Sequence, residues 1–199
     1  MKVQGTHYRS IWYDYKDCQV KIIDQRWLPH DFRIVALTNL DEFAVAIRDM
    51  WVRGAPLIGA TAAYGVAISL SSDASDSGLQ NTYDTLIETR PTAINLKWAL
   101  DRLLRALGQV SQEDRASKAL ELAHLVAEED VGINKKIGEH GLEIVKKIAS
   151  SKPAGEPVRM LTHCNAGWPA TVDWGTATSP MYHAHEAGIP IHVWVDETR

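Results

Sequence analysis

Cysteine is scarce in this sequence: among 199 residues there are only two, Cys18 and Cys164, and they lie far apart. This scarcity excludes a disulfide framework and predicts a cytoplasmic protein. The first residues lack the apolar core of a secretory signal peptide. The least polar stretch, residues 54–70, is too short to span a bilayer, so no membrane anchor is expected.

Neither sign of charge is in large excess, and several common motifs are missing. A net charge of −4 gives no basic surface for nucleic acid or anionic lipid, so neither is expected as a partner. The glycine-rich signatures of nucleotide sites and the nucleophile elbow of serine hydrolases are absent. With 45% hydrophobic and 23% charged residues, the composition is that of a globular protein that buries a sizeable core.

The first 150 residues predict a small β element followed by helices. Alternating segments at 8–13 and 20–24 flank a polar turn, which is typical of a β-hairpin or small meander. From Thr38 the period becomes helical, beginning with a capping signal. Further helices are expected over residues 56–70, 79–88, 91–107, 111–132 and 135–150.

The segment 151–157, which contains proline and glycine, predicts a domain boundary. Beyond it a strand (158–164), a helix (170–187) and a second strand (191–195) form one βαβ unit, the opening of a Rossmann-like parallel sheet. The predicted fold class is therefore α/β, with a β-hairpin plus helical domain at 1–150 and the start of a Rossmann-like domain at 157–199. Two parallel strands and one helix leave a sheet face and edge uncovered, so we expect that second domain to be incomplete.

Cys164 stands at the end of the first of these strands, in the sequence Leu-Thr-His-Cys-Asn-Ala-Gly. Open α/β sheets place their ligand crevices at the C-terminal ends of parallel strands. The Asn-Ala-Gly that follows permits a sharp turn and a close backbone approach. Cys164 is therefore a candidate site residue, and a buried structural cysteine is the alternative.

Two arginines precede predicted helices. Arg53 and Gly54 stand ahead of a helix that has Pro56 in its first turn, and such a start favours an anion. Arg90 precedes Pro91 in the same way. The pair suits a phosphate monoester held by paired hydrogen bonds. The alternative is two capped helices with solvated arginines.

The histidines do not form a metal-binding pattern. His183 and His185 lie about 200° apart around a helix, so they do not share a metal. His163 and Cys164 alternate across a strand, and no second cysteine is near. We predict structural or surface roles for these histidines and no metal site.

Several segments together resemble the methylthioribose-1-phosphate isomerase family, in the family's order and over nearly the whole chain. They are IDQRWLP at 23–29, VRGAPLIG at 52–59, AAYG at 62–65, RPTAINL at 90–96 and THCNAG at 162–167. The sequences at 167–177 and 193–199 resemble a subgroup that includes enzymes acting on 5-deoxyribose 1-phosphate. The wider superfamily includes regulatory subunits of a translation-initiation exchange factor, which generally lack the cysteine motif.

The resemblance implies an aldose–ketose isomerase of methionine salvage or 5-deoxyribose salvage. Its substrate would be 5-methylthioribose 1-phosphate or 5-deoxyribose 1-phosphate, and its product the ribulose 1-phosphate. By the same resemblance Cys164 is one member of an acid–base pair with an aspartate. Arg53, the backbone at Gly54 and Ala55, and Arg90 hold the phosphate. The resemblance implies no cofactor, and a homodimer for full-length members.

The sequence departs from the family in two respects. Pro169 stands where leucine is usual, which removes a backbone donor and restrains Trp168. Family members also continue beyond the position of Arg199, and by resemblance that continuation carries the catalytic aspartate. The acidic residues at 173, 196 and 197 do not match its motif.

These departures leave three interpretations. We expect the 199-residue chain to be part of an isomerase and inactive by itself. A non-catalytic scaffold of the translation-factor type is an alternative, which Cys164 and the two arginines disfavour. The third is a product that folds poorly and has no activity.

Overall fold

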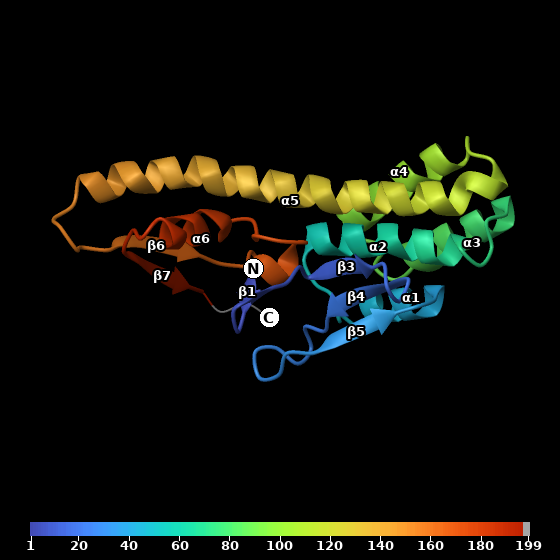
Figure 1. Ribbon diagram of the computed structural model, residues 1–199, viewed down its shortest axis with the longest axis horizontal. Coiled ribbons are helices and arrows are strands. Elements are labelled where there is room, and N and C mark those ends of the chain that lie inside the picture. Colours follow the sequence, from blue (N-terminus) through green and yellow to red (C-terminus); the bar gives the residue numbers. More distant parts are fainter. Residues whose placement is uncertain (197–199) are drawn as a thin grey trace.

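The computed structural model describes residues 1–196. Its N-terminal part is built from short antiparallel strands (Figure 1). β1 (Lys2–Val3) pairs with β2 (Thr6–His7). β3 (Ile11–Asp14), β4 (Gln19–Ile23) and β5 (Ile34–Leu37) form a separate three-stranded meander in that order. The predicted hairpin is confirmed, and β5 extends it on the far side of β4.

Five helices follow, and α2 is the centre of their packing. They are α1 (Leu40–Arg48), α2 (Ala55–Leu70), α3 (Asp76–Ile87), α4 (Ile94–Leu107) and α5 (Gln112–Ser150). Almost every residue of α2 after its first turn is buried, because α1, α3, α4 and α5 pack around it. A helix that is apolar on all sides is stable only inside such a shell. No described helix is both long and apolar enough to cross a bilayer.

The predicted break between residues 132 and 135 is wrong, because α5 is one continuous helix of 39 residues. Gly132 is exposed and interrupts nothing, since a glycine within a helix costs only about 1 kcal/mol relative to alanine. α4 also begins later than predicted. The residues from Arg90 to Ala93 form a turn, with the Ala93 N–H donating to the Arg90 carbonyl oxygen at 3.0 Å, and the helix starts at Ile94.

The C-terminal part is the predicted βαβ unit. β6 (Val158–Thr162) and β7 (Ile191–Val195) pair in parallel, with Met160 opposite Val193. α6 (Ser179–Glu186) connects them and packs on α5. The predicted strands and their parallel pairing are confirmed, although β6 ends before Cys164. Residues 197–199, including the acidic residue at 197, lie outside the described residues.

The helix expected over 170–187 is wrong in its first half. A 3₁₀ turn, η1 (Trp168–Ala170), contains Pro169, and irregular backbone then runs to α6. The Thr171 hydroxyl accepts from the Gly175 N–H at 3.0 Å, so a side chain replaces helical hydrogen bonding. Trp174 and Gly175 both have positive φ, 73° and 74°. Pro169 therefore belongs to η1 and not to the first turn of α6.

α5 runs the length of the molecule, over α2 at its start and over α6 near its end (Figure 1). One face of α5 contains Asp130, Asn134, Gly138 and Gly141, which follow one another at the three- and four-residue spacing of a single helix face. The Ser179 hydroxyl of α6 donates to the Asn134 carbonyl oxygen at 2.7 Å. The chain does turn at 151–157, but the division into two domains there stays a prediction.

Replacing Gly138 with alanine should lower the free energy of unfolding by about 1–3 kcal/mol, the usual cost of overpacking. The added Cβ would lie 2.3 Å from His183 Nδ1 and 2.4 Å from Ser179 Oγ, so these two side chains, or α6 with them, must shift. The matched control is Gly132→Ala on the same helix, where no atom lies within 4 Å and a gain of about 0.5–1 kcal/mol is expected. Urea denaturation measures both. Equal effects of the two variants would contradict the close packing of α6 on α5.

Candidate functional site

Cys164 lies in a turn just beyond the C-terminal end of β6. Its φ is 65°, in the left-handed region, and the residue is exposed. Exposure contradicts the alternative of a buried structural cysteine. We call residues 164–178 the Cys164 turn. Its two ends are joined at Ala166, whose carbonyl oxygen accepts from the Thr176 N–H at 3.0 Å and from the Thr178 hydroxyl at 3.1 Å.

The start of α2 lies directly against the Cys164 turn. Gly54 has φ of 95°, and a Cβ built on it would lie 2.4 Å from the Cα of Ala170. Only glycine permits this approach. The structure therefore brings the Arg53-Gly54-Ala55 segment to the turn that carries Cys164. The start of α4 packs in turn on α2, since a Cβ on Gly59 of α2 would lie 3.0 Å from the Asn95 carbonyl oxygen.

The starts of α2 and α4, like that of α6, differ from the starts of the other three helices. α1, α3 and α5 each begin with a side-chain cap and acidic residues in the first turn. The starts of α2 and α4 have neither. Since acidic residues and caps compete with a bound anion for helix N–H groups, these two starts are suited to receive one.

Arg53 and Arg90 are also distinct among the arginines. Arg53 is exposed, Arg90 is half-buried, and within residues 1–196 neither guanidinium forms an ion pair or a hydrogen bond. Every other arginine of that range donates to a protein acceptor: Arg9, Arg26, Arg33, Arg48, Arg102, Arg105, Arg115 and Arg159. The two arginines chosen from the sequence are thus the two within residues 1–196 whose guanidinium groups have no protein partner.

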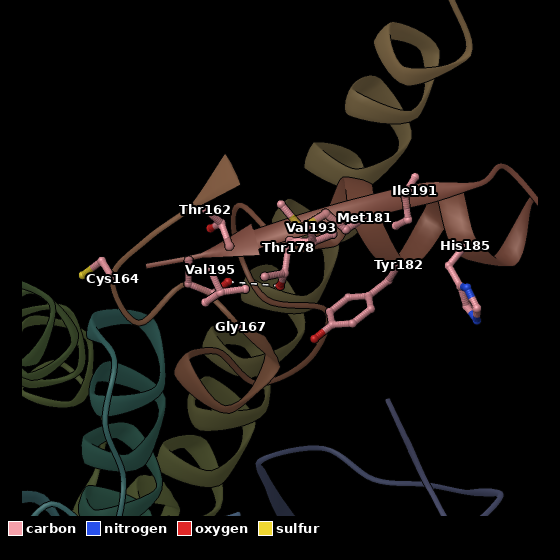
Figure 2. A pocket seen from close by; sticks show the side chains of 11 residues that line it. Thr162, Cys164, Gly167, Thr178, Met181, Tyr182, His185, Ile191, Val193 and Val195 are labelled. Atoms are coloured by element: carbon pink, nitrogen blue, oxygen red, sulfur yellow. Dashed lines mark hydrogen bonds between the residues drawn. The ribbon is translucent and has the colours of Figure 1, made fainter. Parts of the chain in front are cut away.

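A cavity of about 440 Å³ opens beside Cys164, between α6 and the β6–β7 sheet. Its lining is mainly apolar, with side chains such as Met181, Ile191 and Val193 (Figure 2). Cys164 stands at one end, with its sulfur pointing away from the other labelled side chains. Near that end the hydroxyl of Thr162 is buried and has no hydrogen-bond partner among the described residues.

The histidines lie apart from one another. His163 is exposed, and its Nδ1 lies 4.0 Å from a carboxylate oxygen of Asp196. His183 packs on Trp174, and its Nδ1 lies 2.9 Å from the Ser179 carbonyl oxygen. No cluster of three potential metal-binding His, Cys, Asp or Glu side chains occurs in residues 1–196.

Sequence reasoning missed the side chains that hold the Cys164 turn in place. Ser10, Gln25 and Asp130 each bond to its backbone. They come from three separate regions of the chain, and although Gln25 lies in the segment IDQRWLP, no sequence signal groups the three. Burial raises the pKa of Asp130 above its ordinary value, although hydrogen bonds from Val172 and Asn134 act in the opposite direction.

Comparison with known proteins identifies the family. The profile described as the initiation factor 2 subunit family matches residues 51–199. This chain belongs to the initiation factor 2 subunit family. The whole chain is 59% identical to a protein named methylthioribose-1-phosphate isomerase from Escherichia coli O45:K1, of which it covers 54%. It is 56% identical to a protein of the same name from Sinorhizobium medicae, of which it covers 55%.

Two solved structures of this family share the fold. A crystal structure of 5-methylthioribose 1-phosphate isomerase from Pyrococcus horikoshii matches with a TM-score of 0.82 and 34% identity, over 100% of this chain and 57% of that one. A crystal structure of the translation initiation factor eIF-2B, subunit delta, from A. fulgidus matches with a TM-score of 0.81 and 38% identity. The match covers 97% of this chain and 55% of that one. These matches confirm the family resemblance and the α/β fold class. The chain spans about half the length of the curated relatives it matches.

Proposed function

We propose that this chain forms the phosphate-binding and cysteine-bearing part of an aldose–ketose isomerase that acts on 5-methylthioribose 1-phosphate or 5-deoxyribose 1-phosphate. One observation carries the proposal. Arg53 and Arg90, the two arginines of residues 1–196 without protein partners, precede the two helices among α1–α5 that lack a side-chain cap, and the start of one of these helices lies against the Cys164 turn. The names of the relatives supply the substrate class.

The chemistry moves a hydrogen from C2 of the sugar to C1, which requires proton transfers at the sugar carbons and oxygens. Arg53, Arg90 and the backbone at Gly54 and Ala55 hold the phosphate on C1 and so fix the sugar. The Cys164 thiol, at the edge of the cavity, gives or takes a proton, as thiols do near neutral pH when their surroundings favour the thiolate. An aspartate as the second acid–base group rests on the family resemblance alone.

A regulatory or scaffold role of the translation-factor type is the second candidate, supported by the match to the A. fulgidus subunit. Phosphate-monoester binding that depends on Arg53 and Arg90 distinguishes the two functions, since a scaffold has no need of it. Activity of the 199-residue chain alone, the homodimer and the choice between the two sugars stay predictions. For kinetics we define the extended protein as this chain joined after Arg199 to the remaining part of the E. coli relative.

Replacing Arg53 or Arg90 with alanine in the extended protein should act mainly on KM. Each charged hydrogen bond lost from the phosphate costs about 1.5–3 kcal/mol, which corresponds to a rise in KM of roughly ten- to hundredfold. The change in kcat should be smaller, because the phosphate lies away from the breaking C–H bond. The control is Arg105→Ala, because among the described residues the Arg105 guanidinium bonds only to the Asp101 carbonyl oxygen. Unchanged KM in both site variants would overturn the phosphate assignment.

A further inference from the structure

The Cys164 turn has little regular structure of its own, and side chains from other elements hold its backbone. The Ser10 hydroxyl donates to the Trp168 carbonyl oxygen at 3.2 Å. Gln25 Nε2 donates to the Pro169 carbonyl oxygen at 2.6 Å. Both contacts fall in η1, ahead of Val172 in the middle of the turn.

Asp130 bonds to the middle of the turn at Val172, where the Ser10 N–H also donates to the Val172 carbonyl oxygen at 2.9 Å, and it is the one ionisable side chain of the three. Its Oδ2 accepts from the Val172 N–H at 2.7 Å, and its Oδ1 accepts from Asn134 Nδ2 at 2.9 Å. Val172 is fully buried, so its N–H has no alternative partner in water. Among the described residues, Asp130 is thus the only acceptor for the Val172 N–H.

The position of Val172 sets the spacing between the two halves of the candidate site. Ala170, two residues earlier, is pressed against Gly54 with no room for a side chain between them. A displacement of Val172 therefore moves Ala170 relative to the start of α2. The same displacement changes the relation between Cys164 and the helix start that Arg53 precedes.

The charges around Asp130 show that its carboxylate is not placed there by favourable ion pairing. Asp173 is the nearby charge that acts on it, and it adds to the rise in the pKa of Asp130. Asp173 is itself bonded to the Met1 ammonium group at 2.6 Å and to His7 Nε2 at 2.7 Å. The adjacent Glu129 pairs with Arg102 on α4. A partly buried acid with a perturbed pKa, beside a ligand site, is typical of a functional role.

We propose that Asp130 is a positioning residue of this site, which holds the Cys164 turn against the start of α2 through the Val172 N–H. Through this contact the thiol of Cys164 and a phosphate held by Arg53 are coupled. The inference rests on the proposed function and adds to it a residue that carries the coupling.

The test uses the 199-residue chain and needs no turnover. A Cys18→Ser background leaves Cys164 as the only thiol. The measured quantity is the rate of Cys164 alkylation by iodoacetamide, without and with saturating inorganic phosphate. Asp130→Ala removes the acceptor, Asp130→Asn keeps the shape and one acceptor oxygen, and Glu129→Gln is the control from the adjacent position. Thermal unfolding is followed in parallel, and alkylation is measured well below each midpoint.

In the background protein and in Glu129→Gln, phosphate should slow alkylation roughly tenfold, because a nearby anion shields the thiol and disfavours the thiolate. In Asp130→Ala the rate should be nearly the same with and without phosphate. Asp130→Asn should restore part of the phosphate effect. This graded recovery separates positioning from a general loss of stability.

A full phosphate effect in Asp130→Ala would overturn the proposal, whatever its unfolding midpoint. If phosphate has no effect even in the background protein, the phosphate site and with it the proposed function fail. The alkylation rates without phosphate then decide the role of Asp130. Faster alkylation in Asp130→Ala than in Glu129→Gln would still support positioning of the turn, and equal rates would refute it.

Discussion

Replacing Cys164 with serine in the extended protein is expected to lower kcat by about 10²–10⁴-fold, the range typical for loss of a general acid or base. The two side chains have nearly the same shape, so the Cys164 turn and its φ of 65° are not disturbed. A serine hydroxyl does not ionise near neutral pH, whereas a thiol does when its surroundings favour it. KM should change little, because the groups that hold the phosphate are untouched.

Steady-state ketose formation measures this effect, and Cys18→Ser provides the matched control. Cys18 is also exposed and also has a positive φ, 52°, but it lies in the β3–β4 turn, outside the candidate site. Its replacement should leave kcat within about twofold of the parent. If Cys164→Ser kept full turnover, the proton-transfer role would have to be assigned to another group.

Replacing Gly54 with alanine is expected to abolish measurable phosphate affinity and to lower the free energy of unfolding by about 2–4 kcal/mol. Two costs add here. A non-glycine residue at φ of 95° is strained by roughly 1–3 kcal/mol, and the added Cβ meets the backbone of Ala170 at 2.4 Å. Because the clash is with backbone on both sides, the Cys164 turn must separate from the start of α2.

Gly155→Ala is the control for this experiment. Gly155 has φ of 82°, but a Cβ there has no atom within 4 Å. It should therefore show the strain alone, about 1 kcal/mol, and normal phosphate binding. Isothermal titration with inorganic phosphate and urea denaturation measure the two quantities. Normal phosphate affinity in Gly54→Ala would show that the contact between α2 and the turn is not part of the binding site.

Local signals allowed much of this fold to be predicted from the sequence. The cap at Asn39 is present, with its side chain accepting from the Glu42 N–H, and alternation predicted β3 and β4. The continuity of α5 through Gly132 was not predictable, because it depends on tertiary packing that outweighs a weak helix residue. The irregular backbone after Cys164 was missed for a similar reason: Thr171 and Asp173 bond locally and replace helical hydrogen bonds.

In the candidate site, too, some residues are predictable from local sequence signals and others only from tertiary contacts. Motifs mark Arg53, Arg90 and Cys164 in the sequence, and the structure adds that both arginines lack protein partners within residues 1–196. No spacing rule relates Asp130 to Val172, which lies 42 positions further along the chain. Contacts of that kind are made by the fold and are visible only once the fold is known.

The continuity of α5 also determines how the molecule loses its structure. Ala119 and Ala123 of this helix belong to the main core, and Val145 belongs to a second cluster with Val158 and Ala184. A helix can open at one end while its other end stays packed, so the smaller cluster around Val145 can unfold while the main core persists. Cleavage of the chain at 151–157 is therefore expected to weaken the cluster of Val145, Val158 and Ala184 more than the main core, because it frees the segment that carries Val158 and Ala184 from α5.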